Sequence, residues 1–212
     1  MAMKSWHRMG AKSKANWGVT MDSGKIERIA VGRVKDAIEF SDILVPFIDE
    51  NDKTPIWDGN IFVYESPKIE NGSYKGKIPV QVKGKKVDNF SDDTITFPFR
   101  ITDLKSYLKD GGVIFFVVEI IDVINIKIYY SALLPVDIKE LLRRAKDKQR
   151  TISAELSYID LSDTKRLESI CHEFLYHKRL QYSTVDYCGK LEDINIVNFT
   201  VFSGHVPMDK YL

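Results

Sequence analysis

The chain has 212 residues, enough for one domain or for one domain with a small appendage. Its composition, 44% hydrophobic and 29% charged, is typical of a globular protein and excludes a disordered or collagen-like chain. Thirty-one basic residues against thirty acidic ones leave a net charge of +1, which argues against binding nucleic acid through bulk charge but leaves a local basic face open.

Cysteine usage and hydropathy limit the compartment. Cys171 and Cys188 are the only cysteines and form no CxxC pair, so the sequence supports neither a zinc ribbon nor a disulfide framework. The first 17 residues contain no apolar signal-peptide region. The most apolar run, Val113–Ile121, is too short to span a bilayer. We therefore expect a cytoplasmic protein without a membrane segment.

The first half of the chain predicts an arm, a helix and a β-hairpin. Residues 1–23 are basic and resemble a mobile arm, and Ser23 is a candidate cap for a helix that begins near Lys25. Apolar residues recur at helical spacing from there to Ile43. The segments 56–65 and 77–83 read as two strands of a hairpin.

The second half predicts strands that alternate with helices. Pro98 places the strand 94–100 at an edge or irregular position, and the continuous apolar run 113–121 indicates a strand buried on both faces. The remaining expected elements are helices at 103–109, 135–147 and 163–180, and strands at 124–134, 151–161 and 194–202. This order predicts an α/β fold, on the border of α+β, with a mixed central sheet flanked by helices. We divide it into an arm (1–23), a core domain (24–150) and a C-terminal helix–strand extension that packs on the core (151–212).

Three polar residues of the hairpin form a chemical pattern. Gln81 and Lys83 are two positions apart on one strand and project to the same face, and the hairpin can bring Asp58 beside them. Two oxygen ligands with a lysine one step along suit metal-dependent phosphodiester hydrolysis, because hard oxygens hold Mg²⁺ and an ammonium group orients water or neutralises developing charge.

The spacing Asp58…Gln81-x-Lys83 within a helix–strand–strand–helix–strand order resembles the PD-(D/E)XK, or restriction-endonuclease-like, nuclease superfamily. The Q-x-K form resembles Mrr-like restriction enzymes and an uncharacterised bacterial branch found in defence-associated proteins, over roughly residues 24–145. The stretches D-G-N-I-F-V, V-Q-V-K-G and D-L-K-S-Y-L-K-D-G-G-V-I-F-F-V-V also carry this likeness.

The resemblance implies a restriction-endonuclease-like core and an endonuclease that cuts DNA with Mg²⁺ or Mn²⁺. Asp58 matches the metal-binding aspartate, Gln81 the second ligand and Lys83 the catalytic lysine. The family often adds a glutamate from the first helix, for which Glu39 is our choice and Glu27 and Asp36 are the alternatives. It also implies a homodimer and further domains or defence-system partners. Two positions depart from the family pattern: Gln81 is neutral, and Trp57 replaces the nominal proline before Asp58.

Charge is segregated along the chain around this pattern. Six lysines and one acid lie between Lys68 and Lys86, and seven acids and one lysine lie between Asp36 and Asp58. A lysine-rich surface favours phosphate binding through counterion release. The residues expected to contact nucleic acid are Lys75, Lys77, Lys85 and Lys86.

Two other functions fit the same residues. Gln81 is also what a nuclease-fold module that has lost catalysis would carry, binding DNA or a protein. The third alternative is a structural or interaction domain of a longer protein.

Overall fold

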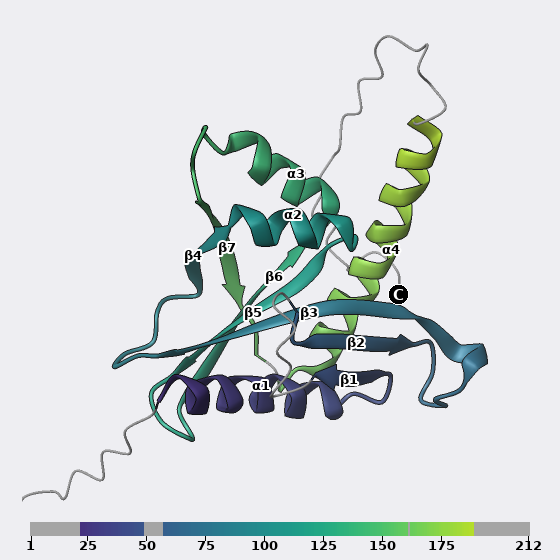
Figure 1. Cartoon of the computed structure of the whole chain (residues 1–212). Coiled ribbons are helices and arrows are strands. Elements are labelled where there is room, and N and C mark those ends of the chain that lie inside the picture. The colour runs from purple at the N-terminus through teal and green to yellow at the C-terminus, as the bar shows by residue number, and fades with distance from the viewer. Residues whose placement is uncertain (1–21, 49–56, 161, 189–212) are drawn as a thin grey trace, which may run out of the picture.

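The computed structural model describes residues 22–48, 57–160 and 162–188, with side chains as far as Gln181, and it contains one mixed seven-stranded sheet flanked by helices (Figure 1). The strand order is β1-β2-β3-β5-β6-β7-β4; β3 and β5 are parallel and all other pairs are antiparallel. This confirms the predicted α/β class. In chain order the elements are α1 (Ser23–Glu39), β1 (Leu44–Ile48), β2 (Gly59–Tyr64), the 3₁₀ turn η1 (Asn71–Ser73), β3 (Tyr74–Lys86), β4 (Thr94–Arg100), α2 (Ile101–Lys109), β5 (Val113–Ile120), β6 (Ile126–Leu133), α3 (Pro135–Arg144), β7 (Thr151–Tyr158) and α4 (Thr164–Cys188).

The N-cap of helix α1 lies one residue earlier than predicted, and the helix begins at Ser23. Asp22, not Ser23, is the N-cap, and its side chain accepts a 2.7 Å hydrogen bond from the Lys25 N–H. The helix ends at Glu39. The apolar spacing that continues to Ile43 therefore covers both the helix and the approach to the next strand.

That strand, β1, is absent from the predicted elements. It has only five residues and contains Pro46, and both properties weaken the pattern of a strand. Pro46 is tolerated because β1 is an edge strand that pairs with β2 alone. It adds a third strand to the predicted β2–β3 hairpin, whose antiparallel pairing is confirmed.

The strands beyond the hairpin follow their sequence patterns. Every residue of β5 is buried, so the continuous apolar run does mark a strand covered on both faces. β6 is its antiparallel neighbour. β4 spans the predicted residues and lies at the far edge of the sheet, where the missing N–H of Pro98 costs no ladder bond.

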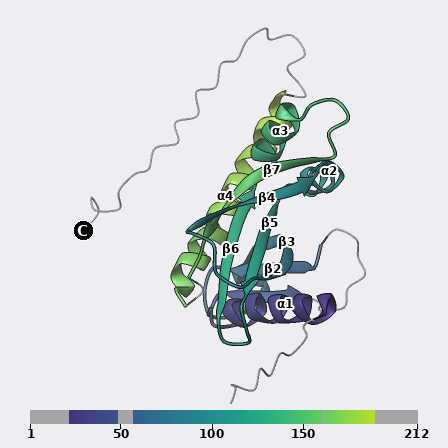
Figure 2. The same ribbon diagram turned by 90° about the vertical axis from the view of Figure 1, so that its left-hand side faces the viewer.

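Two hydrophobic cores lie on opposite faces of the sheet. Helices α1 and α4 cover one face, and their side chains pack on residues such as Val80, Val82 and Phe116. Helices α2 and α3 cover the other face together with β4, around Phe115, Val117 and Tyr129. Figure 2 shows α4 and α2 on opposite sides of the strands. Alternate residues of β3 and β5 therefore enter different cores.

The last described elements belong to the same sheet and core. β7 pairs with β4 along its whole length but with β6 only through Tyr129↔Tyr158 and Tyr130↔Ser157. Leu167 and Phe174 of α4 enter the first core. The predicted strand 194–202 and residues 1–21 of the predicted arm lie outside the described residues.

None of the described helices combines the length and apolar character that crossing a membrane would require.

Candidate functional site

The candidate site forms where β2 stops pairing with β3. The first β2–β3 pair is Gly59↔Val80, so residues 81–86 of β3 pair only with β5 among the described strands. Asp58 immediately precedes β2, and its N–H donates a 3.0 Å hydrogen bond to the Val80 carbonyl. This bond fixes the Asp58 side chain at the beginning of the open edge of β3.

The Asp58 carboxylate accepts two short hydrogen bonds from β3. Its Oδ2 lies 2.6 Å from the Gln81 Nε2 and 2.6 Å from the Val82 N–H. The same Gln81 Nε2 lies 3.5 Å from the Val82 carbonyl oxygen. Asp58 and Gln81 are 8% and 4% exposed, so this is a buried polar contact rather than a surface pair. The structure thus brings together two of the three residues that the sequence singled out.

Lys83 lies on the same side of β3 as Gln81. Both residues line a cavity of about 240 Å³ whose other wall comes from β4 and α2. Gln81 lies at the buried end, whereas Lys83 is exposed and has no side-chain hydrogen bond or ion pair among the described residues. Its ammonium group is therefore available to an anionic ligand at the mouth of the cavity.

The end of β4 and helix α2 supply three polar residues that sequence reasoning did not assign to the site. Arg100 Nε and Asp103 Oδ2 form a 2.8 Å ion pair that lines the cavity beside Tyr107. Burial, followed by the negative charges of Asp103 and Asp58, raises the pKa of Tyr107 well above its usual range, although Arg100 opposes this. The Tyr107 hydroxyl therefore keeps its proton next to two carboxylates. Tyr107 meets Asp58 and Gln81 from far away in the sequence, so no local sequence pattern indicates that it belongs to the site.

Trp57 lies between the hairpin and α2. Its ring lies edge-on to Tyr107, with centroids 6.3 Å apart. Its indole N–H is buried and has no hydrogen-bond partner within the described part of the chain. Trp57 therefore fills the position before Asp58 as a packing residue that links the hairpin to α2.

The structure does not bring the predicted helix acid to this site. Glu39 is exposed on α1, which packs on the sheet face opposite Gln81 and Lys83. Glu27 is also exposed, and Asp36 lines a surface hollow with Phe40 and Tyr158. Side chains alternate between the two faces of β3. Val80 and Val82 point toward α1, so Gln81 points away from this helix and its acids.

The four lysines expected to contact nucleic acid have different environments. Lys75 pairs with Glu65 at 3.4 Å, and Lys85 pairs with Glu119 at 3.4 Å. The ammonium group of Lys86 donates to the Ile121 carbonyl at 2.7 Å. The Lys77 side chain is exposed and has no hydrogen bond or ion pair within the described ranges.

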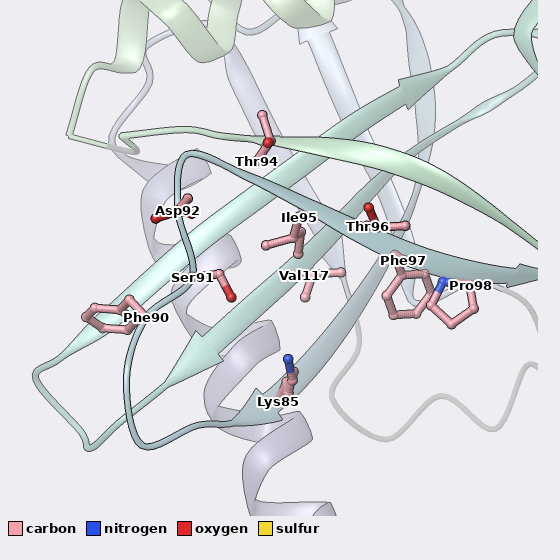
Figure 3. A pocket seen from close by; sticks show the side chains of 10 residues that line it. All are labelled: Lys85, Phe90, Ser91, Asp92, Thr94, Ile95, Thr96, Phe97, Pro98 and Val117. Atoms are coloured by element: carbon pink, nitrogen blue, oxygen red, sulfur yellow. The ribbon is translucent and has the colours of Figure 1, made fainter.

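A larger cavity of about 590 Å³ continues along β3 beyond Lys83 (Figure 3). Lys85 faces it from the end of β3, and Phe97 and Pro98 of β4 line both cavities. The buried Glu119 fixes the position of Ser91, which lines this cavity. Its carboxylate accepts hydrogen bonds of 2.9 Å from the Ser91 N–H and 2.8 Å from the Ser91 hydroxyl. Burial alone would raise the pKa of Glu119, but these bonds and Lys85 lower it, so the carboxylate stays charged.

The oxygen donors available for a metal are few. No group of three His, Cys, Asp or Glu side chains is close enough to hold an ion among the described residues. The candidate site offers the Asp58 carboxylate, the Gln81 amide oxygen and the Val82 carbonyl. Mg²⁺ is commonly held by one or two carboxylates and completes its shell with water and substrate phosphate. The set fits such an ion once the Gln81 amide turns its oxygen inward.

No family model, no curated protein and no solved structure matches this chain.

Proposed function

We propose that the protein is a Mg²⁺-dependent nuclease that hydrolyses phosphodiester bonds of DNA and acts in the bacterial cytoplasm as part of a defence system. The observation that supports this proposal best is the buried hydrogen bond between the Asp58 carboxylate and the Gln81 amide at the open edge of β3, with Lys83 lining the same cavity as Gln81. The resemblance of the Asp58…Gln81-x-Lys83 motif to PD-(D/E)XK nucleases agrees with this assignment, and Mn²⁺ is the alternative ion.

The proposal gives each residue a distinct task. Asp58 and Gln81 hold the ion together with the Val82 carbonyl, and the burial of both side chains keeps water from competing for their oxygens. A bound Mg²⁺ polarises the phosphate and lowers the pKa of a coordinated water. Lys83 lies at the mouth of the cavity, where its ammonium group neutralises negative charge on the phosphate.

The test is cleavage by the purified full-length protein. A fluorescent DNA oligonucleotide incubated with Mg²⁺ is cut by the wild type and remains intact in EDTA. Asp58→Asn and Lys83→Ala reduce the rate by at least about 100-fold, because the first removes the charged metal ligand and the second removes the ammonium group beside the phosphate. Asp58→Asn preserves the shape of the buried side chain, and circular dichroism checks its fold.

Lys105→Ala is the matched control. Lys105 is an exposed lysine of α2 that does not line the cavity, so its removal leaves the rate within twofold of wild type. Wild-type rates in Lys83→Ala, or cleavage that persists in EDTA, would exclude the proposed site.

A second function is favoured by one specific observation. The Gln81 amide and the Val82 N–H donate to Asp58, so protein groups alone satisfy hydrogen bonding at its Oδ2. A module that binds DNA without cutting it needs only these hydrogen bonds at Asp58 and no metal ion. Salt-sensitive DNA binding, no cleavage with Mg²⁺ or Mn²⁺, and no metal uptake by calorimetry would together identify it.

A further inference from the structure

An aromatic ladder crosses the strands next to the candidate site. Phe47 of β1 lies 4.7 Å from Phe62 of β2, measured between ring centroids. Tyr74 of β3 lies 6.0 Å from Phe62 and 5.8 Å from Tyr64. We call Phe47, Phe62, Tyr64 and Tyr74 the aromatic platform.

The platform lies on the same side of the sheet as Gln81 and Lys83. Ile61 and Val63, which alternate with Phe62 and Tyr64, are buried in the first core under α1 and α4. The second core, under α2 and α3, contains no residue of β1 or β2. Phe47 is 62% exposed and Tyr74 is 44% exposed. The platform is therefore not covered by any described helix.

The platform adjoins Asp58. Phe47 pairs with Asn60, two residues after Asp58, and a Cβ on Gly59 would meet the Phe47 carbonyl at 2.0 Å. Gly59 has φ +148°, a backbone conformation that glycine adopts readily. The close approach of β1 to Gly59 therefore sets the end of the platform beside the candidate site.

Two lysines border the platform on the side of Asp58. Lys77 pairs with Phe62 across the strands and lines a pocket of about 380 Å³ with Asn60 and Lys178. The Lys178 ammonium donates to the Asp110 carbonyl at 2.9 Å. Burial, and then the nearby Lys77, lower the pKa of Lys178, whereas Asp110 raises it. Two lysines and the Asn60 amide line this one pocket, and such a set of donors suits a bound phosphate.

We propose that this face binds single-stranded DNA, with bases stacked on Phe47 and Tyr74 and a backbone phosphate between Lys77 and Lys178. The proposal rests on the proposed function and specifies its substrate as a single strand that leads into Asp58, Gln81 and Lys83. Exposed aromatic rings stack on base faces, which a single strand presents and a duplex conceals. Lysines beside aromatic rings match the alternation of phosphate and base.

A second copy of the chain fits the same face less well. Edge-to-edge pairing of β1 would need a regular ladder, and Pro46 lacks the N–H for it. Like-charged Lys77 and Lys178 at the border also oppose a self-complementary contact.

The test is fluorescence anisotropy with a labelled oligo-dT strand and a hairpin duplex of equal charge, in EDTA so that no strand is cut. The wild type binds the single strand at least tenfold more tightly than the duplex. Phe47→Ala and Tyr74→Ala each weaken single-strand binding roughly 5- to 150-fold. Phe47→Trp retains binding and Phe47→Leu loses it, because stacking requires a ring. Lys77→Ala reduces the slope of log affinity against log salt by about 0.7.

Phe40→Ala is the matched control, since Phe40 is 79% exposed and lines the hollow beside Asp36 and Tyr158. It leaves affinity unchanged. Equal binding of duplex and single strand, wild-type affinity in Phe47→Ala, or a dimer that Phe47→Ala converts to a monomer would each overturn the platform. Platform-dependent binding without any cleavage would refute only the nuclease activity, whereas Lys83-dependent cleavage with unaltered binding in Phe47→Ala would refute only the platform.

Discussion

The buried contact between Asp58 and Gln81 depends on whether the Gln81 amide presents its nitrogen or its oxygen to the carboxylate. With the amide nitrogen toward Asp58, the carboxylate is satisfied by hydrogen bonds at 2.6 Å. With the amide oxygen turned inward, the same three groups offer oxygens to a cation. A hydrogen bond from a neutral amide to a buried carboxylate contributes about 1.5–3 kcal/mol, so a metal must offset its loss.

Gln81→Glu separates these uses. A second carboxylate beside Asp58 repels the first when no metal is present, so we expect the variant to melt at a lower temperature than wild type in EDTA. Mg²⁺ removes the repulsion and gains a second charged ligand. The measurement is the difference in melting temperature between 10 mM Mg²⁺ and EDTA, which we expect to be several degrees larger in the variant, as about 1 kcal/mol corresponds to roughly 2–4 °C.

Gln81→Leu provides the comparison, because it removes the amide oxygen without introducing a carboxylate. It should show no Mg²⁺-dependent stabilisation at all. Equal shifts in the wild type, Gln81→Glu and Gln81→Leu would mean that the ion binds elsewhere.

Helix α1 owes its close approach to β3 to a missing side chain. A Cβ on Gly84 would lie 2.7 Å from the Ile26 carbonyl oxygen and 3.0 Å from the Ala30 Cβ. Both contacts belong to the backbone or to a stiff methyl group, so the helix must move to admit a methyl group. Gly84 thus sets the distance between the helix and the strand that carries Gln81 and Lys83.

Gly84→Ala should therefore destabilise the protein by about 1–3 kcal/mol, the usual cost of overpacking a core. Gly32→Ala in α1 is the matched substitution, because a Cβ there meets nothing within 4 Å. It should stabilise the protein by about 0.5–1 kcal/mol through helix propensity. Urea denaturation measures both, and a neutral Gly84→Ala would contradict the close packing.

The elements show where sequence patterns suffice. Strands β4 and β5 were predicted to within a residue because their patterns, alternation with Pro98 and a continuous apolar run, are local. Strand β1 was missed because five residues with a proline carry too little signal. The helix acid was unpredictable for a different reason: which sheet face α1 covers is decided by tertiary packing, and Glu39 lies on the other face from Gln81.

The candidate site also contains residues that sequence patterns can place and residues that they cannot. Asp58 and Gln81 could be placed together from the hairpin, since antiparallel pairing is a local consequence of the turn. Asp103 and Tyr107 reach the site because α2 packs on the second core, and Arg100 reaches it from the end of β4. No spacing along the sequence encodes that packing, so only the structure identifies these three residues as part of the site.

At the level of the whole molecule, both cores depend on a single sheet. Cys171 of α4 is buried in the first core, and burial, followed by the nearby Glu168, raises the pKa of its thiol to about 12. A thiol that stays protonated and buried is inert to alkylation. Cys171 therefore reports the integrity of the core that supports α1, α4 and the hairpin.

We expect Cys171 in the native protein to resist iodoacetamide at pH 8 and to react in urea along the same transition as the loss of circular dichroism. Peptide mass spectrometry follows Cys171 separately from Cys188. Labelling of Cys171 well below the unfolding midpoint would show that α4 detaches from the sheet on its own.

The parallel pairing of β3 with β5 has a consequence for how the protein is made. The β2–β3 hairpin, with Asp58 and Gln81, is a local structure of a kind that forms within about 1–10 μs. Strand β5 can join β3 only after β4 and α2 have left the ribosome, because a parallel partner requires a crossover. During synthesis Asp58 and Gln81 thus meet before Phe115 and Tyr107 can bury them. A nascent chain therefore carries the motif without its cavity, and the cavity is complete only when the crossover has formed.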